Sequence, residues 1–315
     1  MKAYAKKNAV ALSAAMGSIV CYGITPVFLK YFVDYLDPWT VNGVRYTTGA
    51  LFWLPFVVLL LNRSEASLPA VPRRRVWRAA LLPAAINLAG QVGWGVTPYF
   101  LDATVIGFVY KLHFLFTILF GFLLIREERA LAREPWFYIG AVTCFAGVAV
   151  MFLKDLLESE GQSLIGMAIL MITTILFGAY AVAVRRCMAG YPARLSFGVI
   201  SLYTAPGLVT LMFLFGDYRA LGELPGWMWA FVIASAVSGI AVAHVLYYRA
   251  IHGLGAIVST GLLMATPFVT LAGSQLLLRE QLSALQISGG LTVVGGGVML
   301  VLAQGKVVME QSRGG

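Results

Sequence analysis

Apolar residues follow one another along this chain in ten long runs, separated by short segments of turn-forming or polar residues such as Asp37-Pro38 and Gly222 to Gly226. A helix needs about 20 apolar residues to cross a bilayer. The runs cover residues 9–32, 39–61, 79–99, 103–125, 136–153, 164–184, 195–216, 227–249, 255–278 and 284–303. This pattern predicts an all-α integral membrane protein with ten transmembrane helices.

Composition supports the same class. Hydrophobic residues make up 60% of the 315 residues and charged residues 12%, and the mean hydropathy is +0.83. A soluble domain has about 25% charged residues, so this composition excludes a soluble enzyme, a disordered chain and a secreted disulfide scaffold. The three cysteines, Cys21, Cys144 and Cys187, have no CxxC spacing, and we interpret them as small apolar packing residues. The sequence predicts no metal site and no cofactor.

The basic residues fall mainly on one side of the predicted membrane. With the N-terminus placed in the cytoplasm, 17 of the 23 Lys and Arg residues lie on the inner side and 4 on the outer side, while Arg45 and Lys111 lie inside spans. This excess follows the positive-inside rule and predicts that both termini are cytoplasmic, in the cell (inner) membrane. The net charge of +9 therefore sets orientation in the lipid bilayer, and we expect no nucleic-acid partner.

The chain contains an internal repeat of five spans. A shift of 153 residues places Leu277 to Glu280 on Leu124 to Glu127, and a shift of 155 places Phe177-Gly178 on Tyr22-Gly23. The repeats cover residues 9–153 and 164–303. Because five is an odd number, the second repeat enters the membrane from the opposite side. Such an inverted repeat is typical of secondary transporters, in which two similar halves expose one central site to either side in turn.

Several motifs resemble the EamA domain of the drug/metabolite transporter superfamily. The stretch from Tyr22-Gly23 to Lys30 is similar to its W-G-x-x-x-x-x-x-K pattern, with Tyr in place of Trp. Arg45 in the second span also matches, as does the Glu that ends the fourth and ninth spans before a glycine-punctuated helix. Lys111-Leu-His113-Phe114 departs from the small or apolar stretch ending in Pro that Ala265-Thr266-Pro267 retains.

The resemblance covers nearly the whole chain as two EamA-like repeats. It implies a bundle of ten helices with both termini inside and a central cavity lined by helices 1–4 and 6–9. Helices 5 and 10 are then peripheral. Members of this superfamily move small metabolites, often out of the cell.

Ionisable groups at membrane depth are costly and call for a functional explanation. Lys111 lies about eight residues into the fourth span, and we interpret it as a cation for substrate binding or gating. The alternative is a lysine that snorkels or binds carbonyls at a broken helix. His113 either faces the cavity or makes a contact between helices.

The repeat also pairs polar and aromatic positions of the two halves: Gln91 with His244, Trp94 with Tyr247, and Thr25 with Tyr180. Asn87 precedes Gln91 by one turn and extends its face. These residues either line the cavity or join helices through hydrogen bonds. The predicted solute cavity contains Tyr22, Thr25, Asn87, Gln91, Trp94, Lys111, His113, Tyr180, His244, Tyr247 and Thr266.

Three further residues are predicted to have gating or structural roles. Pro26 and Pro267 each remove a backbone hydrogen bond inside a span, so they are candidate hinges. For Arg45 we favour an ion pair or a carbonyl contact at the outer mouth, with Asp34 or Asp37 as candidate partners. Glycines crowd helices 5 and 10 and suit close helix packing, either within the chain or in a homodimer through these helices.

No Asp or Glu lies inside a predicted span. A carboxylate-relay antiporter for cationic drugs needs such an acid, whereas the membrane charges here are both positive. We therefore expect a secondary transporter that works by alternating access and exports small amino-acid-like or organic-acid solutes, by uniport or with proton coupling through His113 or His244. The alternatives are a drug, nucleoside or other metabolite permease of the same superfamily and a non-transporting receptor or scaffold. No nucleophile–base pair points to an enzyme.

Overall fold

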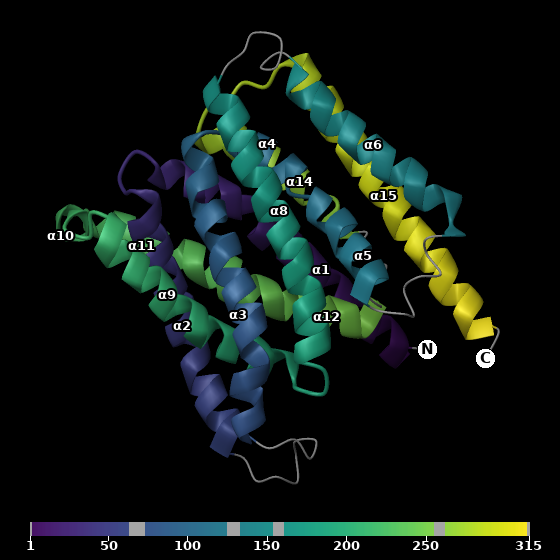
Figure 1. Cartoon of the computed structure of the whole chain (residues 1–315), viewed down its shortest axis with the longest axis horizontal. Helices are drawn as coiled ribbons and strands as arrows, with labels where there is room; N and C mark the ends of the chain where they lie inside the picture. Colours follow the sequence, from purple (N-terminus) through teal and green to yellow (C-terminus); the bar gives the residue numbers. More distant parts are fainter. Residues whose placement is uncertain (1, 63–72, 125–132, 154–160, 255–261, 314–315) are drawn as a thin grey trace.

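The structure, a computed structural model, describes residues 2–62, 73–124, 133–153, 161–254 and 262–313, and in these ranges it contains helices and turns but no strand. The first half comprises α1 (Lys2–Phe32), α2 (Pro38–Asn62), α3 (Arg73–Val96), η2 (Thr97–Tyr99), α4 (Ala103–Val109), α5 (Leu112–Leu124) and α6 (Pro135–Met151). The second half comprises α8 (Gly161–Cys187), α9 (Ala193–Phe215), α10 (Ala220–Glu223), α11 (Gly226–Ala236), η4 (Val237–Val242), α12 (Ala243–Leu254), α14 (Thr266–Leu277) and α15 (Ala284–Arg313). Figure 1 shows them as one bundle.

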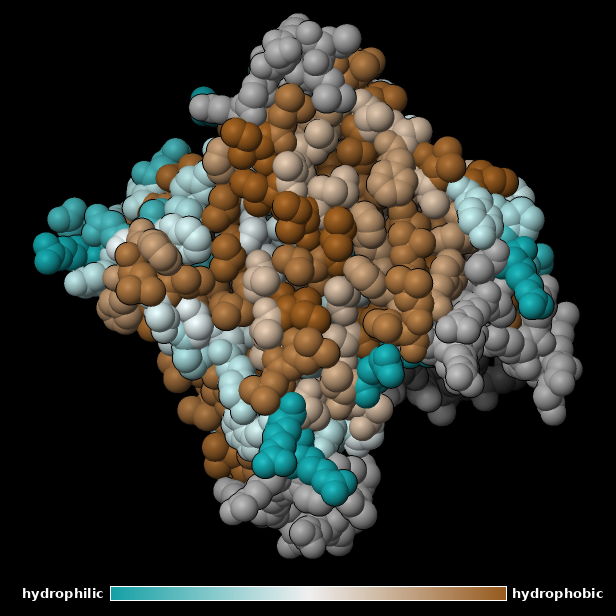
Figure 2. All heavy atoms as spheres, in the orientation of Figure 1, coloured by the Kyte–Doolittle hydropathy of each residue, from teal (hydrophilic) through white to brown (hydrophobic). Residues whose placement is uncertain are grey.

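The predicted all-helical membrane architecture is confirmed. Within the described residues, eight helical segments are long and apolar enough to cross a membrane. The fifth predicted span is a shorter apolar helix, α6, and the ninth, 255–278, includes α14 but also residues 255–261, which lie outside the described residues. The face shown in Figure 2 carries a broad hydrophobic area across the middle of the bundle, with hydrophilic residues toward its ends, as a lipid-facing surface requires.

Helix pairings in one half reappear in the other. The 155-residue shift maps α1 onto α8 and α2 onto α9, and the 153-residue shift maps α3 onto the run α11–η4–α12. Accordingly, α1 packs against α12 and α14, while α8 packs against α3 and α5. The pairs α2–α9 and α6–α15 each join a helix to its own counterpart. This exchange of partners is the contact pattern of two repeats related by a two-fold axis.

Helix α6 and helix α15 lie side by side at the edge of the bundle (Figure 1). A Cβ atom at Gly140 would lie 2.9 Å from the carbonyl oxygen of Gly296, and one at Gly147 would lie 2.7 Å from that of Gly289. Only glycines allow backbones to approach this closely. These glycine faces therefore meet within the chain, so the predicted homodimer would have to use other faces of the two helices, and it stays a prediction.

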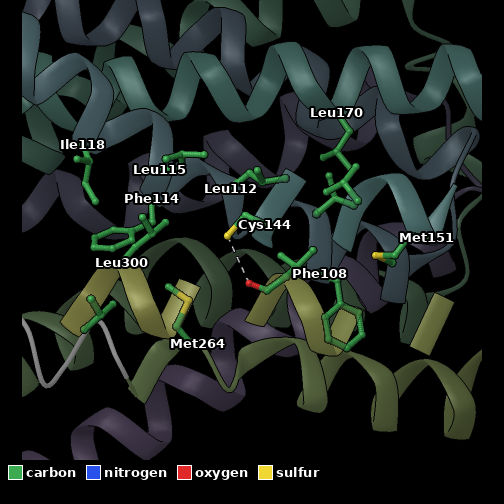
Figure 3. Packing of buried hydrophobic residues seen from close by; sticks show 14 of the residues in the cluster. Phe108, Leu112, Phe114, Leu115, Ile118, Cys144, Met151, Leu170, Met264 and Leu300 are labelled. Carbon is green, nitrogen blue, oxygen red and sulfur yellow. Dashed lines mark hydrogen bonds between the residues drawn. The ribbon is translucent and has the colours of Figure 1, made fainter. Parts of the chain in front are cut away.

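The largest apolar cluster fills the space between the broken fourth span and the α6–α15 pair. Figure 3 shows Leu112 next to Cys144 of α6 and Phe114 next to Leu300 of α15, all members of this cluster. The Cys144 thiol is buried and donates a weak hydrogen bond to the carbonyl of Val293, with sulfur and oxygen 3.6 Å apart. Cys144 is thus an apolar packing residue, as expected.

Candidate functional site

Two spans are interrupted at matching positions. Helix α4 ends at Val109 and α5 begins at Leu112, so the predicted fourth span is broken by a turn at residues 110–111. In the second half a turn at residues 264–265 precedes α14, about 153 residues further along. Interrupted helices at corresponding positions of two halves are where transporters bind their solutes. Pro267 lies in the first turn of α14, where a backbone N–H is not needed, so it marks this interruption.

Lys111 occupies the break in the fourth span. Its side chain is buried, with 8% of the residue exposed, and its ammonium makes no hydrogen bond or ion pair with any described residue. The backbone turns tightly around it, because its N–H donates to the carbonyl of Phe108 at 3.1 Å and its own carbonyl accepts from the N–H of Phe114 at 3.2 Å. A buried charge without a partner costs several kcal/mol, so this lysine is poorly explained as a structural residue.

His113 and Trp94 belong to one aromatic group around Tyr110. The His113 ring stacks on that of Tyr110 with centroids 4.6 Å apart, and its Nδ1 lies 2.8 Å from the Tyr110 carbonyl. Trp94 of α3 packs on Tyr110 at 4.7 Å and on Phe177 of α8 at 6.3 Å. The structure therefore brings these two predicted residues together. It also adds Tyr110, which the sequence did not indicate as a site residue because the 153-residue shift pairs it with an apolar residue, Leu263.

Tyr22, His244 and Tyr247 form a second aromatic group. Tyr22 of α1 makes edge-on contacts with His244 at 5.4 Å and with Tyr247 at 6.5 Å, both from α12. The His244 ring also packs on Phe197 of α9 at 4.4 Å. His244 Nδ1 lies 2.9 Å from the carbonyl of Ile240, one turn earlier in η4.

The two aromatic groups are counterparts in the repeat. The pair Trp94–Phe177 maps onto the pair Tyr247–Tyr22, and the interplanar angles are 81° and 77°. A Cβ atom at Gly23 would meet Val269, and one at Gly178 would meet Phe116. These two contacts are also equivalent, because the 155-residue shift places Gly178 on Gly23 and the 153-residue shift places Val269 on Phe116. The two halves thus make equivalent side-chain contacts at these positions.

Asn87 lies outside this aromatic arrangement. Its side-chain amide donates to the hydroxyl of Tyr46 at 2.5 Å and to that of Thr204 at 3.0 Å, so it joins α3 to α2 and α9. The structure thus favours the helix-joining alternative for Asn87. Gln91, one turn later, differs, because its half-buried side chain makes no hydrogen bond to the described residues and only its carbonyl is engaged, by Asn42.

The predicted threonines bond to backbone carbonyls three or four residues earlier, Thr25 within α1 and Thr266 across the turn that precedes α14. The Thr25 hydroxyl donates to the carbonyl of Cys21 at 2.9 Å, one residue before Pro26, and the Thr266 hydroxyl donates to that of Leu263 at 3.0 Å. Thr25 also packs directly against Gly239 of η4, because a Cβ atom added at Gly239 would lie 2.5 Å from the Thr25 hydroxyl oxygen. Both threonines therefore brace irregular helix segments with their side chains.

Arg45 contacts the start of the irregular segment in the eighth span. Its Nε donates to the Ser235 hydroxyl at 2.8 Å and its Nη2 donates to the Ser235 carbonyl at 3.3 Å, and only 3% of the residue is exposed. Asp37, one of its expected partners, instead accepts from backbone N–H groups, including that of Asp217 at 2.9 Å. The structure thus supports the carbonyl contact and not the ion pair with Asp34 or Asp37.

Glu280 provides a contact between the halves that the repeat alone does not reveal. Its carboxylate accepts from the backbone N–H of Ala103 at 2.8 Å and from the hydroxyl of Thr104 at 3.1 Å, and the side chain of Asp102 makes no capping bond to α4. A carboxylate suits the positive end of a helix. Glu280 thus caps a helix of the opposite repeat. Its counterpart Glu127 lies outside the described residues.

No group of three or more His, Cys, Asp or Glu side chains able to hold a metal ion occurs among the described residues. The chemistry available in these spans therefore comes from cations, hydroxyls, amides and aromatic rings. These groups can bind and orient a solute.

A family model for EamA-like transporters matches residues 9–153 and 164–302, which is most of the chain. The chain belongs to the EamA-like transporter family. It is also similar to an uncharacterized transporter of Archaeoglobus fulgidus, with 21% identity over 280 residues that cover 88% of this chain and 94% of the relative. A protein of known crystal structure shares the fold, with a TM-score of 0.62 at 17% identity, over 94% of this chain and 98% of the other. This EamA-like transporter is thus a multi-pass membrane protein.

Proposed function

We propose that this EamA-like transporter is a secondary transporter for a small solute with a carboxylate or similar anionic group, and that it exports amino-acid-like or organic-acid solutes by alternating access. The observation that carries the proposal is the buried ammonium of Lys111 at a broken helix, without a partner among the described residues. A bound anion would supply the missing counter-charge in a low-dielectric setting, where such a pair is strong.

Three further observations agree with an anionic solute. The predicted spans contain no carboxylate, so a solute cation would find no counter-charge there. Arg45, the other cation inside a span, is buried, and among the described residues its hydrogen bonds go to neutral groups of Ser235. The matched contacts of the two halves suit alternating access, since equivalent helices can exchange their packing about one centre. The proposed setting is the inner membrane with both termini in the cytoplasm.

Thermal stability of the purified protein tests the solute class. We expect succinate or L-glutamate to raise the melting temperature of the wild type and to lose this effect in Lys111→Met, because that variant keeps the side-chain length but not the charge. Choline serves as the cationic probe. The proposal is wrong if choline stabilises the wild type while neither carboxylate does. Counterflow of the stabilising solute in proteoliposomes then distinguishes a transporter from a receptor.

A further inference from the structure

A cavity of about 280 Å³ opens at the end of α8 and the start of α9. Its polar lining consists of Tyr180, Arg185, Tyr191 and Ser196, and the rest of the wall is apolar. Tyr180 is a predicted cavity residue, and Arg185 lies in the last turn of α8. The cavity lies on the side that the positive-inside rule assigns to the cytoplasm. Its volume and mixed lining are those of a small-solute site.

Phe197 separates this cavity from buried polar groups. The residue lines the cavity, and its ring packs on His244 at 4.4 Å and on Trp53 at 5.8 Å. The Trp53 indole N–H is buried and has no hydrogen-bond partner among the described residues, which is uncommon for a buried donor. His244 in turn contacts Tyr22. A solute that displaced the Phe197 ring would therefore reach an unused donor and the second aromatic group.

The corresponding cation of the first half joins two helices. Lys30 is the counterpart of Arg185 at a shift of 155 residues, and its ammonium donates to the carbonyl of Pro98 at 2.9 Å, which ties the end of α1 to η2. The hydroxyl of Tyr99 also donates to the carbonyl of Leu36 across the same junction. Equivalent cations thus lie in different surroundings, one holding two helices together and one at the wall of a cavity.

We propose that the α8–α9 cavity is the cytoplasmic docking site for the anionic group of the solute, with Arg185 as the binding cation and Phe197 as the gate to the centre. This inference rests on the proposed function and adds to it the place where the solute is first held. A guanidinium with hydroxyls beside it matches the geometry of a carboxylate. In the opposite state of the transporter, Lys30 would leave Pro98 and take the equivalent role at the outer face.

The test compares Arg185→Gln with Arg186→Gln in proteoliposomes made of phosphatidylcholine alone. Both arginines lie in the last turn of α8 and are exposed, but only Arg185 lines the cavity. The solute is whichever of succinate, L-glutamate and inorganic phosphate shows counterflow. We expect Arg185→Gln to raise its half-saturating concentration on the cytoplasmic side about tenfold, because the variant loses a charge-assisted hydrogen bond. Arg186→Gln should change it less than about twofold.

Cysteine labelling gives an independent readout. In a protein with Cys21, Cys144 and Cys187 replaced by alanine, Ser196→Cys should react with an anionic thiol reagent from the cytoplasmic side, and saturating solute should slow that reaction at least threefold, as occupancy of the cavity requires. Phe197→Ala should speed reaction at Tyr22→Cys, behind the gate.

The outcomes separate this inference from the proposed function. The docking site is overturned if the two arginine variants have equal effects and the solute does not protect Ser196→Cys. If Lys111→Met no longer transports that same solute, the proposal of an anionic solute still stands. Counterflow of choline alone would overturn the proposed function itself. An effect of Arg185→Gln seen only after phosphatidylglycerol is added would identify a lipid headgroup as the occupant, and this result also overturns the inference.

Discussion

The two halves of the molecule place equivalent helices around one centre but give them different polar groups. In the first half α3 is regular and the broken fourth span holds Lys111, whereas in the second half the third helix contains the π-helical segment η4 and Met264 lies at the break. The packing contacts are repeated, as the Gly23 and Gly178 environments show. The difference teaches that the repeat maintains the fold, and the proposed function assigns solute binding to a position where the halves diverge.

The sharpest way to break this comparison is to exchange the residues at the two interruptions. Met264 is 3% exposed within an apolar cluster and packs on Gly297, so Met264→Lys should lower the free energy of unfolding by about 3–5 kcal/mol. Lys111→Met removes a charge without a partner among the described residues, and the solute-free protein should be as stable as the wild type or more so. Chemical denaturation in detergent measures both changes.

Met264→Leu is the matched control and should cost less than about 1.5 kcal/mol. A loss of stability in Lys111→Met as large as that in Met264→Lys would show that Lys111 is a structural residue. The assignment of solute binding to the broken fourth span would then be wrong.

The α6–α15 contact sharpens the comparison, because here both halves contribute glycines. Gly147→Ala would place a Cβ 2.7 Å from the backbone of α15, and we expect a loss of about 1–3 kcal/mol. Gly295→Ala is the control, since nothing lies within 4 Å of its added Cβ, and it should leave stability unchanged or raise it by up to about 1 kcal/mol. Thermal unfolding that is equal for the two variants would contradict this packing.

Hydropathy was sufficient to predict the helical membrane architecture, because a span is defined by length and apolarity. The repeat in the sequence predicted which positions of the two halves correspond, and the Tyr22–Tyr247 and Trp94–Phe177 contacts, which map onto each other, agree with that correspondence. The interruption at residues 110–111 was predicted only as an alternative setting for Lys111, and the π-helix η4 was not predicted, because apolar composition does not distinguish a continuous span from a broken one. The partner of Arg45 was also missed, since a serine hydroxyl and carbonyl give no charge signal in a sequence.

The Arg45–Ser235 contact tests the role of η4, the π-helical segment whose counterpart in α3 is regular α-helix. Arg45→Gln and Ser235→Ala should each cost about 1–3 kcal/mol, because each leaves a buried polar group less well satisfied. A double-mutant cycle should give a coupling energy of about 1–2 kcal/mol. Additive effects of the two substitutions would show that this contact does not hold η4 in place.

The smallest expected effect concerns the Glu280 cap on α4. Glu280→Gln keeps one hydrogen-bond acceptor but removes the charge at the helix N-terminus, so we expect a loss of about 0.5–1.5 kcal/mol. Glu223→Gln, at a residue that makes no such contact to α4, should change stability by less than about 0.5 kcal/mol. Equal melting temperatures of the two variants would indicate that the carboxylate does not cap α4.

The opposite orientation of the two halves in the membrane underlies the whole account, and paired cysteine labelling tests it most directly. Asp34 and Ala189 are exposed counterparts, 155 residues apart. In a background without the native cysteines, a membrane-impermeant maleimide applied to intact cells should label Asp34→Cys at once and label Ala189→Cys only after permeabilisation. Labelling of both positions from the same side of the membrane would contradict the account.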